Sequence, residues 1–124
     1  MVKATILVID DDENILKVLK TTLNANGFEV YTKSKSLEAL EIFKNNKIDL
    51  VLLDLIMPEL NGVEMYKKLR VINKDIPIIL MSAYPEAMEI SKMNIESLGN
   101  HIKKIQKPFE TDNLLKLIKD FLHE

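Results

Sequence analysis

Three apolar runs of strand length constrain the fold of this sequence more than any other feature. They cover residues 5–9, 50–53 and 76–81, and none alternates apolar with polar residues as a strand with one face in water does. Such strands are typical of a parallel sheet that is covered on both faces. The sequence therefore predicts the central strands of a parallel sheet, with a shorter strand over 28–32.

Stretches with helical spacing of apolar residues separate these runs. They predict helices over 15–23, 37–43, 63–72 and 112–122. A fifth helix is expected over 86–101, where the apolar residues follow no single stripe. Strands that alternate with helices in this way predict right-handed crossovers and an α/β fold with a doubly wound sheet.

The composition narrows the class of protein. The chain has 124 residues, close to the usual size of one domain, and 47% of them are hydrophobic and 29% charged. No apolar stretch approaches the roughly 20 residues that a membrane span needs. The absence of cysteine and of a signal-peptide pattern favours the cytoplasm. Basic and acidic residues are interspersed and leave a net charge of -2, so direct nucleic acid binding is not expected.

Charged and hydroxyl side chains follow the predicted strands where each strand ends. Three consecutive aspartates occupy residues 10–12 after the first strand, Asp54 and Ser82 follow two later strands, and the segment at Lys107 is expected to follow a fifth strand. In a doubly wound sheet, ligands bind beyond the carboxyl ends of the strands. Two carboxylates about 5 Å apart repel by roughly 3 kcal/mol at an effective dielectric constant of about 20. We therefore expect a divalent cation and Lys107 to compensate the acidic cluster, while Asp12 caps the helix that follows.

Four motifs occur in a fixed order along the chain. They are VIDDD at 8–12, DLVLLDLIMPELNG at 49–62, IILMSA at 78–83 and KPF at 107–109. Together they resemble the receiver domain of two-component response regulators, of the chemotaxis-regulator type, over essentially the whole chain. The resemblance implies a single receiver domain over 1–124 with no effector domain. It also implies a flavodoxin-like α/β fold, a doubly wound five-stranded parallel sheet in the order 2-1-3-4-5 with five helices on both faces.

The resemblance assigns a role to residues of the two acidic motifs. Asp54 matches the phosphoacceptor, which takes a phosphoryl group from a phosphohistidine on a sensor histidine kinase or phosphotransfer protein. Asp11 matches the direct ligand of Mg2+ (or Mn2+), and Asp10 matches its partner, acting directly or through a water. Asp54 itself and the main-chain carbonyl of Ile56 are expected to complete the protein ligands of the metal.

Two further side chains are expected to act on the phosphoryl group. Ser82 matches the switch hydroxyl, and Lys107 matches the lysine that pairs with the phosphoryl group. Such groups neutralise charge on the transferring oxygens, and the ionised acceptor needs no separate general base. The turn beside the acceptor and a cis-proline after the last strand are expected to involve Met57, Pro58, Gly62 and Pro108.

Two bulky residues are expected to tune the lifetime of the acyl phosphate. Ile56 and Tyr84 lie two residues beyond Asp54 and Ser82, at positions that flank the phosphoryl group in the family. Their bulk predicts shielding from water and slow self-dephosphorylation. The alternative is that Tyr84 packs on the rim of the site, since tyrosine has an apolar ring and a polar tip.

The chain departs from the family pattern between the third and fourth motifs. Receivers commonly carry Tyr or Phe three residues before the lysine, and this position is Lys104 here. The segment from Ser82 to Lys107 is also a few residues longer than usual, and Gly99-Asn100 replaces a small-residue pair. We therefore expect the fourth helix and its loop to form a divergent output surface for a downstream protein, or for an effector domain absent from this chain.

Three other functions share parts of this pattern. A receiver-like interaction domain would lack one of the acidic residues, and all of them are present. A flavin-binding protein of this architecture would need a hydroxyl- and glycine-rich phosphate loop where the three aspartates stand. A metal-dependent phosphatase would need a cap or a larger pocket. The expected function is a signalling module that catalyses only its own phosphorylation and dephosphorylation, rather than an enzyme with other substrates.

Overall fold

The fold is a parallel sheet of five strands between helices. This computed structural model describes residues 3–55, 62–83 and 101–122. The sheet has the order β2-β1-β3-β4-β5, and every pairing is parallel. Its strands are β1 (Thr5–Ile9), β2 (Glu29–Lys33), β3 (Leu50–Asp54), β4 (Ile78–Ser82) and β5 (Ile102–Gln106). The predicted α/β class and the strand order 2-1-3-4-5 are confirmed.

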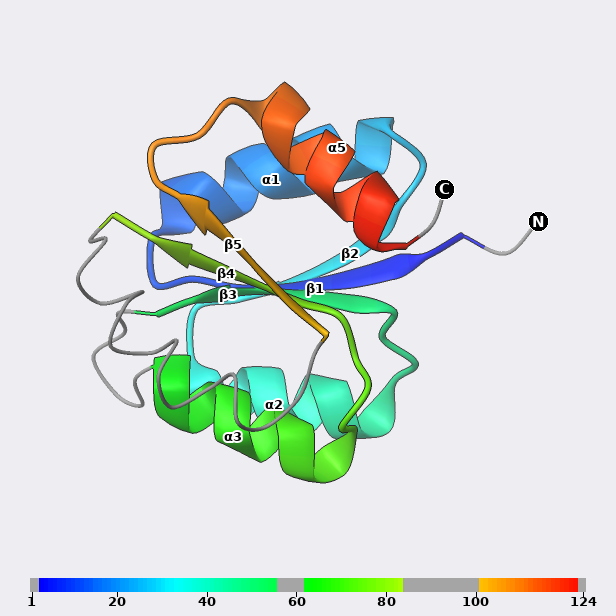
Figure 1. Cartoon of the computed structure of the whole chain (residues 1–124), viewed down its shortest axis with the longest axis vertical. Helices are drawn as coiled ribbons and strands as arrows, with labels where there is room; N and C mark the ends of the chain where they lie inside the picture. The colour runs from blue at the N-terminus through cyan, green and yellow to red at the C-terminus, as the bar shows by residue number, and fades with distance from the viewer. Residues whose placement is uncertain (1–2, 56–61, 84–100, 123–124) are drawn as a thin grey trace.

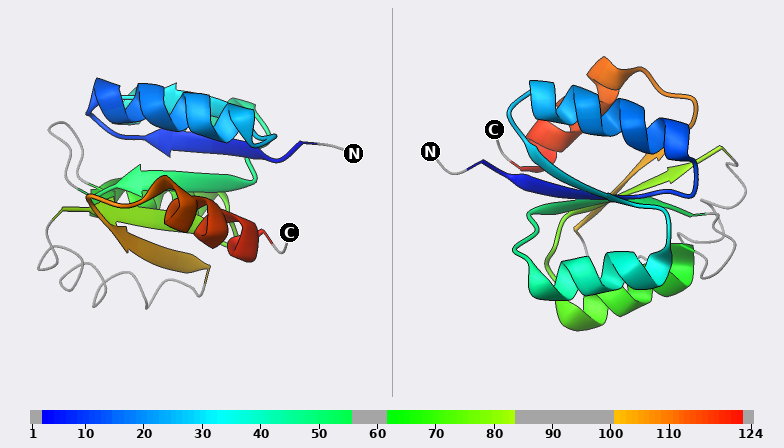
Figure 2. Two further views of the ribbon diagram at one scale, coloured as in Figure 1. Left: turned by 90° about the horizontal axis from the view of Figure 1, so that it is seen from above. Right: turned by 180° about the vertical axis from the view of Figure 1, so that it is seen from behind.

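Helices cover both faces of the sheet. The described residues contain α1 (Glu13–Ala25), α2 (Ser36–Asn45), α3 (Gly62–Ile72) and α5 (Thr111–Phe121). α1 and α5 lie on one face and α2 and α3 on the other (Figure 1), as the view from behind also shows (Figure 2). None of these four helices has the length and apolar character needed to cross a membrane. The helix predicted over 86–101 lies outside the described residues, apart from His101, so the fifth helix stays a prediction.

Two strands begin later than the sequence pattern indicated. The strand predicted over 76–81 is β4, which starts at residue 78, and the strand predicted over 28–32 is β2, which starts at residue 29. Pro77 has no N–H to donate to a neighbouring strand. The N–H of Phe28 instead closes the turn after α1 by donating to the carbonyl of Leu23.

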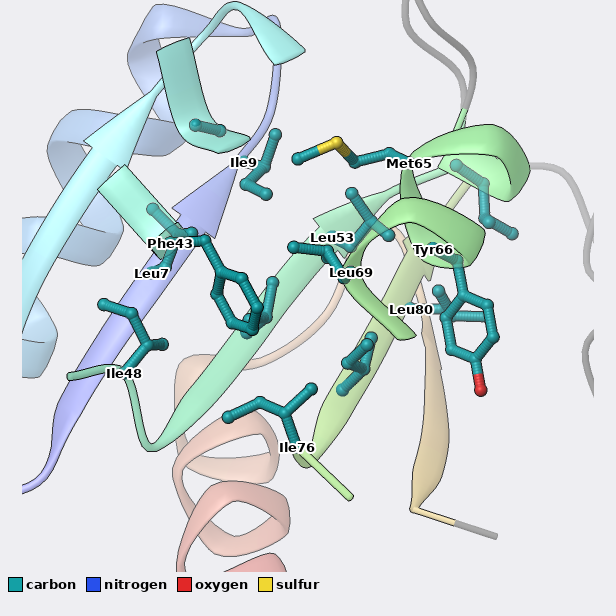
Figure 3. Close-up of a cluster of buried hydrophobic side chains, with 14 residues drawn as sticks. Leu7, Ile9, Phe43, Ile48, Leu53, Met65, Tyr66, Leu69, Ile76 and Leu80 are labelled. Atoms are coloured by element: carbon teal, nitrogen blue, oxygen red, sulfur yellow. The ribbon is translucent and has the colours of Figure 1, made fainter. Parts of the chain in front are cut away.

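The three central strands are buried on both faces. All five residues of β1, β3 and β4 are buried. The core on the side of α2 and α3 (Figure 3) includes Leu7, Ile9, Phe43, Leu53, Met65, Tyr66 and Leu69. The core on the side of α1 and α5 includes Ile6, Val8, Leu16, Leu19, Leu52, Leu114 and Ile118. Because each large apolar side chain contributes about 1.5–3 kcal/mol when buried, the two cores fix the strands in place.

α1 begins with a side-chain cap directly after the acidic motif. Oδ1 of Asp12 accepts the N–H of Asn14 at 2.9 Å and the N–H of Ile15 at 3.4 Å. These bonds satisfy N–H groups that have no partner within the first turn of a helix. The capping role predicted for Asp12 is confirmed, which leaves Asp10 and Asp11 for other contacts.

A buried arginine joins α3 to the starts of two strands. Arg70 is 6% exposed. Its guanidinium donates to the hydroxyl of Tyr66 at 2.8 Å, to the carbonyl of Ile76 at 2.5 Å and to the carbonyl of His101 at 2.6 Å. Ile76 lies two residues before β4 and His101 directly before β5, so these bonds fix the amino ends of the two strands. No motif or apolar pattern in the sequence marks Arg70 for this role.

Arg70→Met is expected to lower the free energy of unfolding by about 3 kcal/mol, because hydrogen bonds from a charged donor contribute about 1.5–3 kcal/mol each and buried carbonyls lose their donor. Urea unfolding followed by circular dichroism measures the change. Lys67→Met, at an exposed position of the same helix, is the control and should change stability by less than about 0.5 kcal/mol. Equal stability of the two variants would contradict the role given to Arg70.

Candidate functional site

The carboxyl ends of β1, β3, β4 and β5 lie along one edge of the sheet (Figure 1). Asp10 directly follows β1, Asp54 ends β3, Ser82 ends β4 and Lys107 directly follows β5. Asp10, Asp54 and Ser82 are buried, whereas Asp11 is exposed. The structure therefore brings residues of all four sequence motifs to the same edge.

Three carboxylates form a compact cluster at this edge. Asp10, Asp11 and Asp54 each offer one oxygen, and these oxygens lie within 4.8 Å of one another. Hard oxygen donors at this spacing suit a divalent cation such as Mg2+ or Mn2+, and concentrated negative charge favours its binding. The donor set therefore fits the predicted metal. The carbonyl of Ile56, the other predicted ligand, lies outside the described residues.

Lys107 supplies positive charge to this cluster. Its ammonium donates to Oδ2 of Asp10 at 2.6 Å and lies 3.6 Å from Oδ2 of Asp54. The lysine side chain is 16% exposed. Because solvent screens such a pair less than a surface pair, the ammonium offsets part of the repulsion between the two carboxylates. The same ammonium is within reach of an oxyanion bound beside Asp54.

Main-chain hydrogen bonds tie the strand ends together beside the cluster. The N–H of Lys107 donates to the carbonyl of Ser82 at 2.8 Å, and the N–H of Leu55 donates to the carbonyl of Met81 at 3.0 Å. The peptide bond before Pro108 is cis, as expected. The ends of β3, β4 and β5 are thus linked pairwise by hydrogen bonds at the residues that carry or adjoin the candidate side chains.

Gly62 lies against the backbone that carries Asp54. Its N–H donates to the carbonyl of Leu55 at 2.8 Å. A β-carbon on Gly62 would lie 2.4 Å from Cα of Leu55 and 2.6 Å from the carbonyl oxygen of Asp54. Backbone atoms cannot give way as the tip of a flexible side chain can, so a larger residue would displace the end of β3. Gly62 belongs to the turn motif found in the sequence. This close contact with the backbone is the physical reason why the position requires glycine.

Several predicted residues lie outside the described part of the chain. They are Ile56, Met57, Pro58 and Tyr84, and the roles expected for them stay predictions. Lys104 is described, and its side chain is exposed on β5. This position therefore presents a cation to solvent where receivers commonly carry an aromatic ring.

An apolar groove, which the sequence pattern did not predict, adjoins the acidic cluster at Lys107. Its volume is about 490 Å³, and its lining comes from the first half of α1, the end of β4 and the segment between β5 and α5. The lining residues are Asn14, Ile15, Val18, Leu19, Ala83, Lys107, Pro108, Phe109 and Thr111. Val18 lies within the helix predicted over 15–23, yet it is 55% exposed and borders this groove instead of the core.

Comparison with known proteins identifies the family. The chain matches the response regulator receiver domain family over residues 6–119. The chain belongs to this family. It is a phosphoacceptor receiver domain of the kind used in two-component signalling, as the resemblance of the four motifs predicted.

Relatives of this receiver domain differ in length. It is 33% identical over 122 residues to sporulation initiation phosphotransferase F of Bacillus subtilis (strain 168), covering 98% of this chain and 96% of that protein. It is 39% identical to the probable transcriptional regulator ycf27 of Cyanidium caldarium, covering 94% of this chain and 45% of that protein. The receiver domain therefore spans nearly all of the first relative and less than half of the second.

Solved structures share the fold of this receiver domain. A CheY-like response regulator receiver domain protein from Methanospirillum hungatei JF-1 aligns with a TM-score of 0.87 and 28% identity, covering 98% of this chain and 95% of that one. The response regulator protein TrrA from Thermotoga maritima, solved in complex with Mg(2+)-BeF, aligns with a TM-score of 0.82 and 34% identity. That alignment covers 95% of this chain and 98% of TrrA.

Proposed function

We propose that Asp54 is the phosphoacceptor of this receiver domain. The observation that carries the proposal is the position of its buried carboxylate, 3.6 Å from the ammonium of Lys107 and within the cluster of three acidic residues. Phosphoryl transfer depends on alignment of the nucleophile and on neutralising charge at the transferring oxygens. β3 holds the carboxylate of Asp54 in place, and Lys107 together with the hydroxyl of Ser82 would act on those oxygens.

Asp10, Asp11 and Asp54, with the carbonyl of Ile56, are the residues that would hold Mg2+ or Mn2+. The fit of the oxygen donors supports this assignment, as does the Mg(2+)-BeF complex of TrrA. When bound, the cation would supply charge neutralisation at the phosphoryl oxygens. Asp10 follows β1 and Asp54 ends β3, and these strands are adjacent, so the sheet itself sets the separation of the two carboxylates that would hold the cation.

The partners follow from this chemistry. We propose that the donor is a phosphohistidine on a sensor histidine kinase or a phosphotransfer protein, in the cytoplasm, where such a kinase finds its ATP. The domain then acts on no separate substrate, because the phosphoryl group remains on its own Asp54 until hydrolysis. A downstream protein, or an effector domain beyond this chain, would respond to the phosphorylated form.

Incubation with acetyl phosphate tests the proposed chemistry without a kinase. The wild-type protein is expected to gain the mass of one phosphoryl group when Mg2+ is present, because the small donor needs only the acceptor and its neutralising charges. Removal of the metal with EDTA should reduce the gain at least tenfold. Intact-mass spectrometry over time measures the rate of phosphoryl incorporation with Mg2+ and with EDTA. Equal incorporation with and without metal would contradict the metal role of the acidic cluster.

We further propose that the apolar groove receives the phosphohistidine-bearing protein. The groove and the acidic cluster share Lys107, so an apolar surface seated in the groove is placed directly beside Asp54. Val18 leaves a large apolar side chain in water at the border of this groove. Contact with a partner protein would bury this side chain and remove apolar surface from water, at the position where a protein donor must approach.

Val18→Glu is expected to slow phosphoryl transfer from a histidine kinase at least tenfold, because a carboxylate would be buried in an apolar interface. The kinase used is the one from the source organism that labels the wild-type domain fastest in purified form. Labelling by acetyl phosphate should be unchanged, since the small donor does not use the groove. Leu37→Glu is the matched control, because Leu37 is exposed on α2 and lies outside the groove lining. Equal slowing by both variants would count against the groove.

A further inference from the structure

β2 is an edge strand whose outer side carries backbone groups that point away from the sheet. Within the described residues, β2 pairs only with β1. In the view from behind, it lies in front of the other strands, between α1 and α2 (Figure 2). The N–H of Glu29 points inward and donates to the carbonyl of Ala4 at 3.0 Å. Because successive residues of a strand direct their N–H and C=O groups to opposite sides, those of Val30 and Thr32 point outward.

The side chains along this edge have a symmetric order of charge. Glu29 stands two residues before Tyr31, the middle residue of β2, and Lys33 stands two residues after it. All three lie on the face that α2 covers, since the hydroxyl of Tyr31 donates to Oδ1 of Asn46 at 3.2 Å and the ammonium of Lys33 lies 3.7 Å from Glu38. Glu29 is exposed, and Tyr31 is 36% exposed. The edge therefore presents an anion, an aromatic ring and a cation in a row.

An antiparallel contact between two copies of β2 matches both the backbone and the charges. With Tyr31 opposite Tyr31 of the second copy, Val30 lies opposite Thr32 of that copy, and each such pair exchanges two hydrogen bonds through outward groups. The same register places Glu29 opposite Lys33 of the second copy, and two-fold symmetry repeats this pair. Opposite charges that face each other across antiparallel strands attract. A register shifted by one residue would place inward groups opposite outward ones and lose the hydrogen bonds.

We infer that the outer edge of β2 joins two copies of this chain through an antiparallel β2–β2 contact. An open strand edge is a template for pairing, and charges on it oppose pairing with most partners. Here the order of the charges selects a second copy. The two β2 strands run in opposite directions, so the carboxyl ends of the two sheets face opposite ways and each acidic cluster stays open. The inference is independent of the phosphoacceptor proposed above.

Sedimentation equilibrium tests the contact in solution. The wild type is expected to form a dimer with a dissociation constant of about 10–100 µM, because a contact centred on one strand is smaller than a standard interface. Glu29→Lys is expected to raise this constant at least about tenfold, since it places like charges opposite each other twice. Lys33→Glu should act in the same way. Asp120→Lys, at an exposed position of α5, makes the same change of net charge as Glu29→Lys and should leave the dimer unchanged.

The two weakened variants are expected to complement each other. In a mixture of Glu29→Lys with Lys33→Glu, both cross-strand pairs again hold opposite charges, so a heterodimer should form with an affinity close to that of the wild type. The double variant should regain its homodimer for the same reason. Three results would each overturn the inference. They are a wild type that stays monomeric at about 1 mM, equal weakening by Glu29→Lys and Asp120→Lys, and a mixture that does not associate.

A cysteine at the two-fold axis tests the register without changing a charge. The chain has no cysteine of its own. Tyr31→Cys would place two Cα atoms about 4.5 Å apart in a pair without mutual hydrogen bonds, within the range that a disulfide spans. It is expected to form a disulfide-linked dimer at least about tenfold faster than Lys35→Cys, whose exposed position lies outside the strand. Non-reducing electrophoresis after mild oxidation measures both rates, and equal rates would overturn the inference.

Discussion

Asp54→Asn is expected to gain no phosphoryl group from acetyl phosphate and Mg2+ under conditions in which the wild type gains one. An amide has no ionised oxygen to attack phosphorus, so loss of the nucleophile removes the reaction completely. The substitution keeps the size of a buried side chain at the end of β3, and the fold should therefore persist. Intact-mass spectrometry measures incorporation, and circular dichroism confirms folding.

Asp12→Asn is the matched control for this loss. Asp12 is an aspartate of the same acidic motif, but its side chain caps α1. Asparagine caps helices as well as aspartate does, so stability should be retained. Incorporation by Asp12→Asn should stay within about threefold of the wild type. Full incorporation by Asp54→Asn would show that another residue accepts the phosphoryl group.

Gly62→Ala is expected to destabilise the domain by about 2–3 kcal/mol and to slow phosphoryl incorporation about a hundredfold. The added β-carbon would meet Cα of Leu55 and the carbonyl oxygen of Asp54, so the end of β3 has to shift. A displacement of about 1 Å at a reacting group can cost about a hundredfold in rate. Urea unfolding and the initial rate of mass gain measure the two effects.

Gly27→Ala is the control that separates strain from the position of the acceptor. Gly27 has a φ of +90° after α1, and a β-carbon there would meet nothing within 4 Å. Alanine at this φ is expected to destabilise the domain by about 1–2 kcal/mol. The rate of incorporation should be unchanged, because Gly27 lies at the amino ends of the strands. A slow Gly27→Ala variant would indicate that stability alone limits the reaction.

The fold was predictable because local patterns and topology agreed. The unbroken apolar runs that became β1, β3 and β4 have no polar positions to place in water, so both of their faces had to be covered. Parallel strands bring their carboxyl ends to one edge of a sheet. The convergence of Asp10, Asp54, Ser82 and Lys107 therefore followed once the strands were assigned.

Other features were not predictable because they depend on contacts between distant segments. The spacing of apolar residues in α1 suggests that Val18 packs against the sheet. It cannot show that Val18 instead borders a groove between α1 and the segment that joins β5 to α5. In the sequence, Arg70 looks like one more basic residue of α3, because two of its three acceptors, the carbonyls of Ile76 and His101, lie outside the helix. The preference of Lys107 for Asp10 over Asp54 likewise depends on the relative placement of three strands.

Trapping of the acyl phosphate tests the central claim most directly. Borohydride reduces an aspartyl phosphate to homoserine, which marks the acceptor permanently for peptide mass spectrometry. After treatment with acetyl phosphate and Mg2+, the wild-type protein is expected to carry homoserine at position 54. Reduction at any other aspartate, or a phosphorylated protein with Asp54 unmodified, would contradict the assignment of Asp54 as the phosphoacceptor.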